Sequence, residues 1–479
     1  MCESGFDPDD DTAVITAITD AARAEAAAAA RRLAAIHALM DLRLLDDDER
    51  ELWACDPWDA AAAEIGAALG LSQRRASGQM YLARAMHTRL PRVFALLTAG
   101  AVSARTASTI AWRTHLVIDD DALAAIDSAI ADQAVHWGPL SDAKLDLAID
   151  KVLAEHDPDA VRAFEAAARG RDVQFGKPED DTGTSSMWGR LYSTDAALIK
   201  KRLVELTRHL CAGDPRSAGE RRVDALGAMA AESGPLACRC GNSGCAGATV
   251  KPSRSPAVIH VLADERAITA ARTGISKDAT QTAAPAPVRQ PAAVLQGGGI
   301  VPQPLLQELL LNGARVKPLT APPTHPEPGY RPSAALAAFV RARDMFCRFP
   351  GCSTPAQFCD IDHVIPYPVG PTHPSDLRCL CRKNHLLKTF WTGEQGWSDV
   401  QHPDGTIVWT SPTGHTYTTH PGSRLVFPDW DVTTATLTLA ASGSASTPNR
   451  GLQMPRRTRT RGAERAQRMK SARAQRDTS

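Results

Sequence analysis

Residues 358–368, FCDIDHVIPYP, decide what kind of fold the C-terminal part of this chain can form. They place Asp360, Asp362 and His363 within four residues, in a run of strand-forming residues that ends in turn-forming prolines. Two interpretations are open. The run is either a loop that carries polar side chains, or a site where carboxylates and an imidazole bind a metal ion for catalysis.

Cysteines stand on both sides of this run. Cys347 and Cys352 precede it with the spacing C-x4-C, and RCLCRKNH follows it with Cys379, Cys381 and His385. A structural zinc ion takes four thiolate or imidazole ligands, usually from two pairs of neighbouring residues. Cys347 and Cys352 form one pair, Cys381 at the start of an expected helix supplies a third ligand, and the fourth ligand stays open. This setting favours the metal interpretation.

The order of these residues resembles the HNH endonuclease domain, the ββα-metal nuclease fold. The wider pattern resembles the 13E12-repeat proteins, which join an N-terminal domain of unknown function (domain 222) to a C-terminal HNH domain. The resemblance covers roughly residues 20–430. It rests on RDMFCRFPGC, CDIDHVIPYPVGPTHPSDLRCLCRKNHLLKTFW and GTIVWTSPTGHTY in the C-terminal part, and on DPRSAGERRVDALGAMA, CRCGNSGC and RPSAALAAFVRARD before it.

The resemblance implies a role for each polar residue of the site. Asp362 and His385 would hold one divalent ion, such as Mg²⁺ or Mn²⁺, and neutral His363 would act as the general base. Lys388, one turn after His385, would contact a flanking phosphate. Asp360 either adds a carboxylate to the ion or is simply exposed. The implied activity is metal-dependent hydrolysis of DNA phosphodiester bonds, linked to a mobile element or to defence.

Two departures from the family pattern favour an alternative function. Asp376 stands where the family has the middle Asn of H-N-H, which braces the loop of the base by donating and accepting hydrogen bonds; a carboxylate only accepts. Asn384 stands where the fourth zinc ligand is expected, so the structural zinc is lost, or is completed by Cys379 or His385. The alternative is a weakened or inactive HNH protein that binds nucleic acid or regulates.

The rest of the chain predicts an α+β multidomain protein. After a flexible acidic N-terminus (1–19), a largely α-helical domain with one small hairpin is expected over residues 20–271. A linker rich in Pro, Ala and Gly (272–329) then leads to the ββα-metal domain (330–431). Residues 432–479 are expected to be a disordered basic tail.

A helix-turn-helix layout is indicated within residues 61–86. One amphipathic helix ends at Gly70, Ser72 can cap the next helix, and Arg74 and Arg75 fall in its first turn. In DNA-reading proteins the second helix of this layout enters the major groove. The other interpretation is an ordinary helical hairpin.

A separate group of cysteines occurs in CRCGNSGC, as Cys238, Cys240 and Cys245. Three close thiols could bind zinc, with Cys211 or His209 as a distant fourth ligand. The alternative is a glycine-rich turn with reduced thiols.

Charge and composition limit the class of protein. The formal net charge of the 479 residues is zero, but ten Lys or Arg stand against two acids from Arg450 onwards, so the tail either contacts a polyanion or only aids solubility. No stretch reaches about eighteen uninterrupted apolar residues, and the acidic N-terminus does not resemble a signal peptide. We expect a cytoplasmic protein that binds DNA, with reduced cysteines and no membrane contact. The oligomeric state stays open.

Overall fold

The computed structural model describes residues 8, 10–44, 49–161, 172–179, 184–250, 259–276, 293–296, 299–311, 313–322, 324–436 and 453–474. The fold is mixed α+β, with many helices and small antiparallel sheets. The chain forms two compact units. Unit 1 combines Met1–Ala168 with Pro318–Ser479, and unit 2 is the intervening segment Arg169–Lys317.

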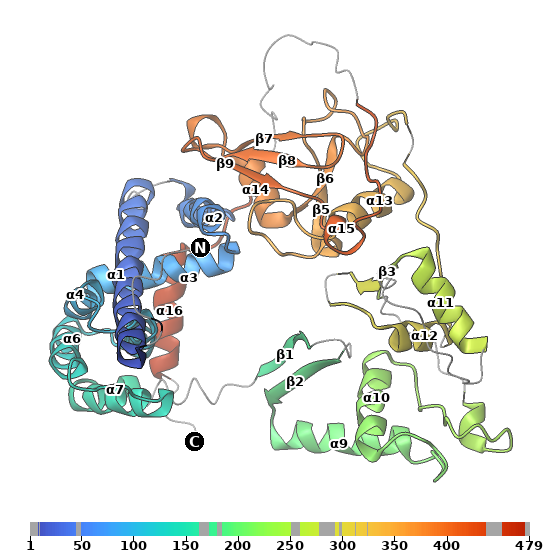
Figure 1. Cartoon of the computed structure of the whole chain (residues 1–479), viewed down its shortest axis with the longest axis horizontal. Helices are drawn as coiled ribbons and strands as arrows, with labels where there is room; N and C mark the ends of the chain where they lie inside the picture. The colour runs from blue at the N-terminus through green and yellow to red at the C-terminus, as the bar shows by residue number, and fades with distance from the viewer. Residues whose placement is uncertain are drawn as a thin grey trace. The chain divides into compact units, whose positions relative to one another are not determined.

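The N-terminal half of unit 1 is helical, as the sequence predicts (Figure 1). Acid or serine side chains accept a backbone N–H at the start of several of these helices, which offsets the unpaired donors there. None of the helices in the described residues is both long and apolar enough to cross a membrane. The helices are α1 (Asp11–Arg43), η1 (Glu49–Leu52), α2 (Pro57–Leu69), α3 (Gln73–Arg84), the π-turn η2 (Ala85–Arg89), α4 (Pro91–Thr98), α5 (Ala104–Arg113), η3 (Thr114–Leu116), α6 (Asp120–Ala134) and α7 (Asp142–His156).

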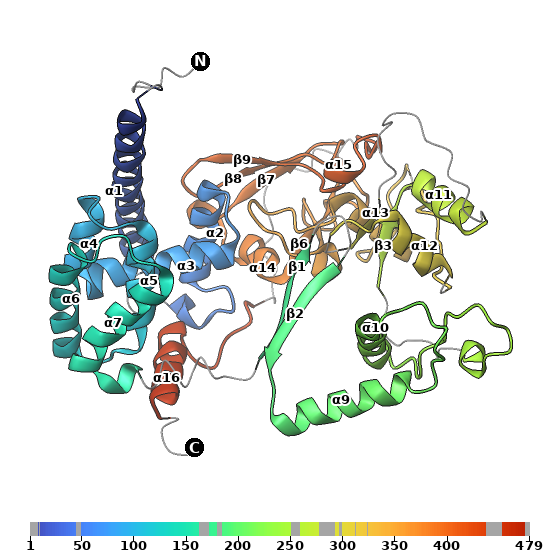
Figure 2. The same ribbon diagram turned by 60° about the horizontal axis from the view of Figure 1, so that its bottom comes forward.

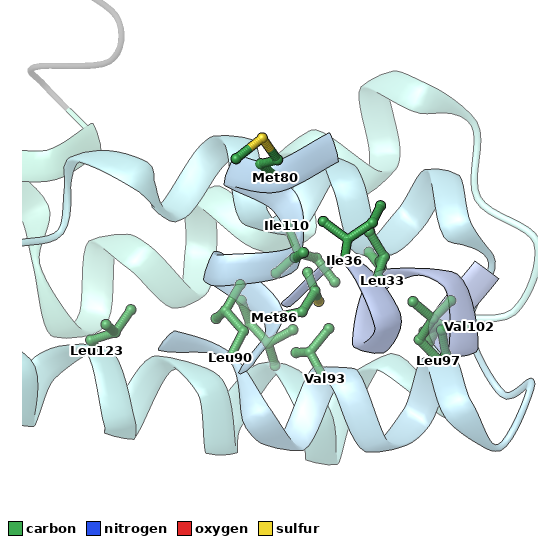
Figure 3. Close-up of a cluster of buried hydrophobic side chains, with 14 of the residues drawn as sticks. Leu33, Ile36, Met80, Met86, Leu90, Val93, Leu97, Val102, Ile110 and Leu123 are labelled. Carbon is green, nitrogen blue, oxygen red and sulfur yellow. The ribbon is translucent and has the colours of Figure 1, made fainter. Parts of the chain in front are cut away.

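Aliphatic side chains from α1, α3, α4, α5 and α6 fill the core between these helices (Figure 3). Burial of such side chains is the main source of their stability. The labelled core residues are Leu33, Ile36, Met80, Met86, Leu90, Val93, Leu97, Val102, Ile110 and Leu123.

The C-terminal half of unit 1 contains two small sheets and the helices around them. Strands β5 (Cys359–His363) and β6 (Leu377–Cys381) pair antiparallel, and α14 (Arg382–Phe390) begins directly after β6. The second sheet has the order β7-β8-β9. The other elements are α13 (Ala334–Asp344), η6 (Ala356–Phe358), η7 (Gly393–Gln395), β7 (Ser398–Gln401), β8 (Ile407–Thr410), β9 (Thr416–Thr419) and α15 (Ser423–Val426).

Helix α2 joins the two halves of unit 1. Its Ile65 packs in the helical core, whereas its Ala63 and Ala67 pack in the C-terminal core. The ammonium of Lys383 in α14 lies 3.0 Å from the carboxylate of Asp59 in α2. The segments predicted as separate domains therefore share an element within one compact unit.

The C-terminal tail differs from the predicted disorder. Residues 453–474 are described and include α16 (Arg461–Ala474), which Figure 1 shows beside the N-terminal helices. Arg461 lies 3.0 Å from Asp56 and 2.8 Å from Asp59, both of which are buried. Arg473 lies 2.9 Å from Asp157. Buried carboxylates require cationic partners, and this requirement orders a segment whose composition predicts disorder.

Unit 2 begins with the predicted hairpin, which is formed by β1 (Asp172–Glu179) and β2 (Thr184–Arg190). The turn of the hairpin lies outside the described residues. The hairpin leads into α9 (Ser193–Thr207) (Figure 2). The predicted linker 272–329 is partly structured: β4 (Ala293–Leu295) pairs with β3 (Val261–Ala263), because apolar residues of this segment are buried against α11. Residues 277–292 lie outside the described residues. The remaining elements are α10 (Ala218–Ala230), η5 (Ala246–Thr249), α11 (Glu265–Ser276) and α12 (Gln303–Leu311).

Candidate metal and catalytic site

The β5–β6 hairpin and α14 bring the two predicted metal ligands together. Asp362 lies on β5 and is 7% exposed, and Oδ1 of its carboxylate is 3.4 Å from Nε2 of His385 on α14. His385 is in the first turn of α14, which starts directly at the end of β6. One carboxylate oxygen and one imidazole nitrogen thus face each other across the hairpin and the helix.

The other ring nitrogen of His385 is held by Asp360. Nδ1 of His385 lies 2.8 Å from Oδ2 of Asp360, which also pairs with Arg382 at 3.3 Å. A carboxylate only accepts, so Nδ1 carries a hydrogen and Nε2 is the ring nitrogen that faces Asp362. Asp360 therefore orients a ligand, a role that neither interpretation of the sequence included.

The second oxygen of Asp362 is bound by two cations. Its Oδ2 lies 2.7 Å from Nζ of Lys388 and 3.2 Å from Nη2 of Arg378. Burial by itself raises the pKa of the Asp362 carboxyl, but Arg378 and Lys388 outweigh burial and hold that pKa below its ordinary value. Asp362 is therefore ionised, and Oδ1 is left for another positive charge.

Lys388 does not fit the predicted phosphate contact. Its ammonium also donates to the backbone carbonyls of His363 and Val364, so its three N–H donors all have partners within the protein. Its side chain is only 13% exposed. The lysine ties α14 to the end of β5 instead of reaching a flanking phosphate.

His363 is oriented by a hydrogen-bond chain. Its Nε2 lies 3.0 Å from Oγ1 of Thr372, and that hydroxyl donates to the carbonyl of Gly329 at 2.6 Å. Since a hydroxyl has one hydrogen, Nε2 of His363 is the donor to Thr372 and the lone pair stays on Nδ1. Burial and the nearby Lys388 lower the pKa of His363, against the opposing effect of Asp362, so the ring is neutral near pH 7.

Asp376 holds the segment after His363. Its Oδ1 accepts the N–H of Ile365 at 3.0 Å, and its backbone carbonyl accepts the N–H of Val364 at 2.8 Å. Its Oδ2 is buried without a hydrogen-bond partner among the described residues. Burial raises the pKa of Asp376 to about 7. When it is protonated, this carboxyl has both an acceptor and a donor, as the expected Asn does.

Three of the predicted zinc ligands form a group next to this site. The sulfurs of Cys347, Cys352 and Cys381 all lie within 4.8 Å of one another, and those of Cys352 and Cys381 are 3.9 Å apart. Cys379 is outside the group: its Sγ lies 3.9 Å from the carbonyl of Val340 in the core. The alternative in which Cys379 completes the zinc site is therefore not supported by the geometry.

Cys359 is a candidate that the sequence interpretation missed. It is the strand partner of Cys381 and its thiol adjoins that of Cys347. Cys359 is nevertheless outside the group of three sulfurs, because its thiol donates to the carbonyls of Thr354 and Pro355. Asn384 is buried at the same place and donates its amide N–H to Sγ of Cys347 at 3.4 Å, so it supports a ligand. No spacing in the sequence reveals this proximity, because it depends on how β5 pairs with β6.

The predicted helix-turn-helix layout is present, but its turn is covered. Gly70 has the left-handed conformation that ends α2, and Ser72 caps α3. The carbonyl of Leu71 in this turn leaves no room for a Cβ at Gly351 of the C-terminal half, so the two segments are in close contact. Arg74 and Arg75 are exposed on the first turn of α3.

Comparison with known proteins assigns the family. A family model described as "Domain of unknown function (DUF222)" matches residues 20–344. The chain belongs to the DUF222 family. The predicted resemblance is thereby confirmed for the N-terminal part. The DUF222 match ends before β5, so the assignment of the following segment to the HNH endonucleases stays a prediction.

Relatives of this DUF222 protein occur in Mycobacterium tuberculosis. The uncharacterized protein Rv3776 is 54% identical over 97% of this chain and 90% of its own length. The uncharacterized protein Rv2100 is 50% identical over 98% of this chain and 88% of its own length. No solved structure matches the chain.

Proposed function

We propose that this protein is an HNH-type endonuclease that hydrolyses DNA phosphodiester bonds with a divalent ion such as Mg²⁺ or Mn²⁺. The observation that carries the proposal is the pair formed by Oδ1 of Asp362 and Nε2 of His385, at 3.4 Å, beside a neutral His363. The pair comes from a β-hairpin and the helix that follows it, which is the ββα arrangement of the nucleases that the sequence resembles.

The donor atoms fit a divalent ion. Adjacent ligands of an octahedral ion with bonds of 2.1 Å are about 3 Å apart, close to the distance between the Asp362 oxygen and the His385 nitrogen. The hydrogen bond from Nδ1 to Asp360 leaves Nε2 of His385 as the nitrogen that would bind the ion in its deprotonated form. An ion held by Asp362 and His385 would stabilise negative charge on the scissile phosphate and on the leaving 3′ oxygen.

His363 would act as the general base at Nδ1. Its hydrogen is on Nε2 and is donated to Thr372, so Nδ1 can accept a proton from the attacking water. Burial keeps the ring neutral at pH 7, which is the form a base needs. Asp376 would keep the segment after His363 in place through the N–H of Ile365. Asp376 thus keeps the hydrogen-bond acceptor that the Asn of the family pattern would supply at this position.

DNA is the proposed partner. Arg74 and Arg75 are exposed on the first turn of α3, where they would meet phosphates or base edges. The α2–α3 turn packs against Gly351, close in sequence to the zinc ligand Cys352, so α3 has a defined position relative to the nuclease half of unit 1. A structural zinc held by Cys347, Cys352 and Cys381 would support that contact. Cys359, whose thiol donates to the carbonyls of Thr354 and Pro355, would have to turn toward the ion to become the fourth ligand.

A second candidate function is DNA binding without cleavage. The two cations on Oδ2 of Asp362 favour it, because Lys388 and Arg378 neutralise the carboxylate that an ion needs. The two functions differ in whether the purified protein binds Mn²⁺ at Asp362 and His385.

Incubation of the full chain with supercoiled plasmid in Mg²⁺, in Mn²⁺ or in chelator tests the proposal. We expect metal-dependent nicking by the wild type and a loss of at least about 100-fold in His363→Ala, with unchanged DNA affinity, because a base acts in the transition state. His402→Ala, which changes an exposed histidine of the β7–β8 turn, is the matched control. Equal nicking by wild type and His363→Ala would overturn the proposed base, and tight DNA binding with no nicking would favour the second function.

A further inference from the structure

Unit 2 contains a second group of four thiols, outside the candidate catalytic site. Cys211 follows the end of α9, and Cys238, Cys240 and Cys245 lie in the loop after α10. Their sulfurs all lie within 4.8 Å of one another. All four cysteines are unoxidised. Two segments that follow different helices thus bring four potential ligands close together.

The spacing of the sulfurs fits a shared metal ion. The sulfurs of Cys211 and Cys238 are 3.6 Å apart, far beyond the bond length of about 2.05 Å in a disulfide. Four thiolates around a tetrahedral zinc ion with Zn–S bonds of about 2.3 Å have sulfurs about 3.8 Å apart. The thiols therefore already have nearly the separation that such an ion imposes.

The loop is built to present its sulfurs to a cation. The N–H of Asn242 approaches the sulfur of Cys240, and the N–H groups of Gly247 and Ala248 approach that of Cys245. A Cβ at Gly247 would lie 2.8 Å from the carbonyl of His209, so only glycine fits there. These contacts fix the conformation of the loop around its sulfurs.

His209 is not the fourth ligand. Its Nε2 contacts the backbone carbonyl of Leu236, which leaves Cys211 as the residue that completes the set. The sequence leaves open whether Cys211 or His209 is the fourth ligand, and the geometry favours Cys211.

This part of unit 2 has little apolar core to hold it together. Leu206, Ala225, Ala228 and Cys238 are its buried hydrophobic residues in the described segment from 193 to 250. Small regions with so little buried apolar surface usually need a metal or disulfides to stay folded. The ion would connect the end of α9 to the loop after α10 and supply that stability.

We propose that Cys211, Cys238, Cys240 and Cys245 bind one structural zinc ion as four thiolates. The site is independent of the proposed nuclease activity and of the thiol group in unit 1. Binding at neutral pH replaces the thiol protons, which are released to solvent.

Differential alkylation of the full-length wild-type protein tests the proposal for each cysteine separately. Native protein is treated with iodoacetamide with or without a strong zinc chelator and analysed by peptide mass spectrometry. We expect the four thiols of unit 2 to be protected at least about 10-fold before chelation and to become reactive after it. Buried Cys55, which is in neither thiol group, is the internal control and should not respond.

Metal analysis of the full chain completes the test. The double variant Cys240→Ser with Cys245→Ser should lose about one equivalent of zinc relative to the wild type, whereas Cys55→Ala should lose none. Equal labelling of the four thiols with and without chelator would overturn the site, whether or not the variants fold. Iron in place of zinc, or an unchanged zinc content in the double variant, would overturn it as well.

Discussion

Nδ1 of His385 lies 2.8 Å from Oδ2 of Asp360, so a half-exposed carboxylate sets which ring nitrogen of His385 faces Asp362. Removal of this acceptor in Asp360→Ala frees the imidazole to rotate and to change tautomer. Loss of a partner of this kind typically costs 10- to 100-fold in metal affinity. We expect Mn²⁺ binding, measured by isothermal titration calorimetry on the full chain, to weaken by about this factor.

Arg382→Ala is the matched control for this prediction. Arg382 is the exposed partner of the same Asp360 oxygen, at 3.3 Å, and its loss leaves the carboxylate beside His385. Mn²⁺ affinity should therefore change less than about 2-fold, as is usual for an exposed ion pair. If the two variants weaken Mn²⁺ binding equally, net charge and not the orientation of His385 explains the effect.

Thr372 should control the protonation site of His363. Thr372→Val removes the hydroxyl that receives the Nε2 hydrogen, and it leaves a buried donor without a partner, which costs about 1 to 3 kcal/mol. Nitrogen NMR of the ring should then show a mixture of tautomers, and nicking should fall by about 10-fold or more. Thr372→Ser keeps the hydroxyl and should keep both properties. A Thr372→Val protein with wild-type tautomer and nicking rate would exclude this role.

Asp376 should make stability depend on pH. Its pKa rises from 3.8 to about 7 on folding, so between these values the folded state binds a proton that the unfolded state lacks. The stability from this group is present below about pH 4 and is lost as pH rises through about 7. Asp376→Asn should remove this slope and raise the melting temperature at pH 8, with little change at pH 4.

The measurement is thermal unfolding of both proteins from pH 4 to pH 8.5. Any gain in nicking in Asp376→Asn should appear above pH 7, where the wild-type carboxylate lacks a donor. Parallel stability profiles for the two proteins would mean that Asp376 titrates normally in the folded state.

The sequence predicts the local parts of the site well. The helix that begins next to Cys381 and the strand around Asp362 follow from local propensities, which depend on neighbouring residues. The partners that set the chemistry are distant in the chain. Arg378 reaches the site through the register of β6, and Thr372 reaches it from the segment between β5 and β6. No spacing in the sequence reveals that register in advance.

The same reason explains the missed elements elsewhere. Arg461 pairs with carboxylates about 400 residues earlier in the chain. Because these partners are so distant, the basic residues around Arg461 resemble a solvated, disordered tail when only the sequence is considered. Cys359 and Cys381 are strand partners although 21 residues separate them, so a search for neighbouring cysteine pairs selects Cys379 instead.

Cys359 and Cys379 should differ in their effect on zinc at the unit 1 site. Cys359→Ala removes a thiol that adjoins Cys347 and should lower the zinc content of the full chain by up to about one equivalent. Cys379→Ala removes a thiol that lies against Val340 and should leave the zinc content unchanged, although it loses core packing. Metal analysis with folding checked by circular dichroism decides. The reverse order of the two effects would restore Cys379 as the ligand.

The ordered tail should contribute measurably to stability. Asp56 and Asp59 are both 2% exposed, and burial together with the charge of Asp59 raises the pKa of Asp56. Arg461→Ala removes a cation within 3.0 Å of both carboxylates and should lower the free energy of unfolding by about 2 to 3 kcal/mol. Urea unfolding of the full chain measures this loss.

The loss in Arg461→Ala should also depend on pH and on Asp56. Protonation of Asp56 removes the need for a cation, so the destabilisation should be smaller at pH 5 than at pH 8. In an Asp56→Asn background the same substitution should cost less, because the two residues act in one interaction. Arg468→Ala changes an exposed arginine of the same helix and should alter stability by less than about 0.5 kcal/mol. If Arg461→Ala and Arg468→Ala behave alike at both pH values, the tail arginines are surface charges, and their contact with Asp56 and Asp59 does not stabilise the fold.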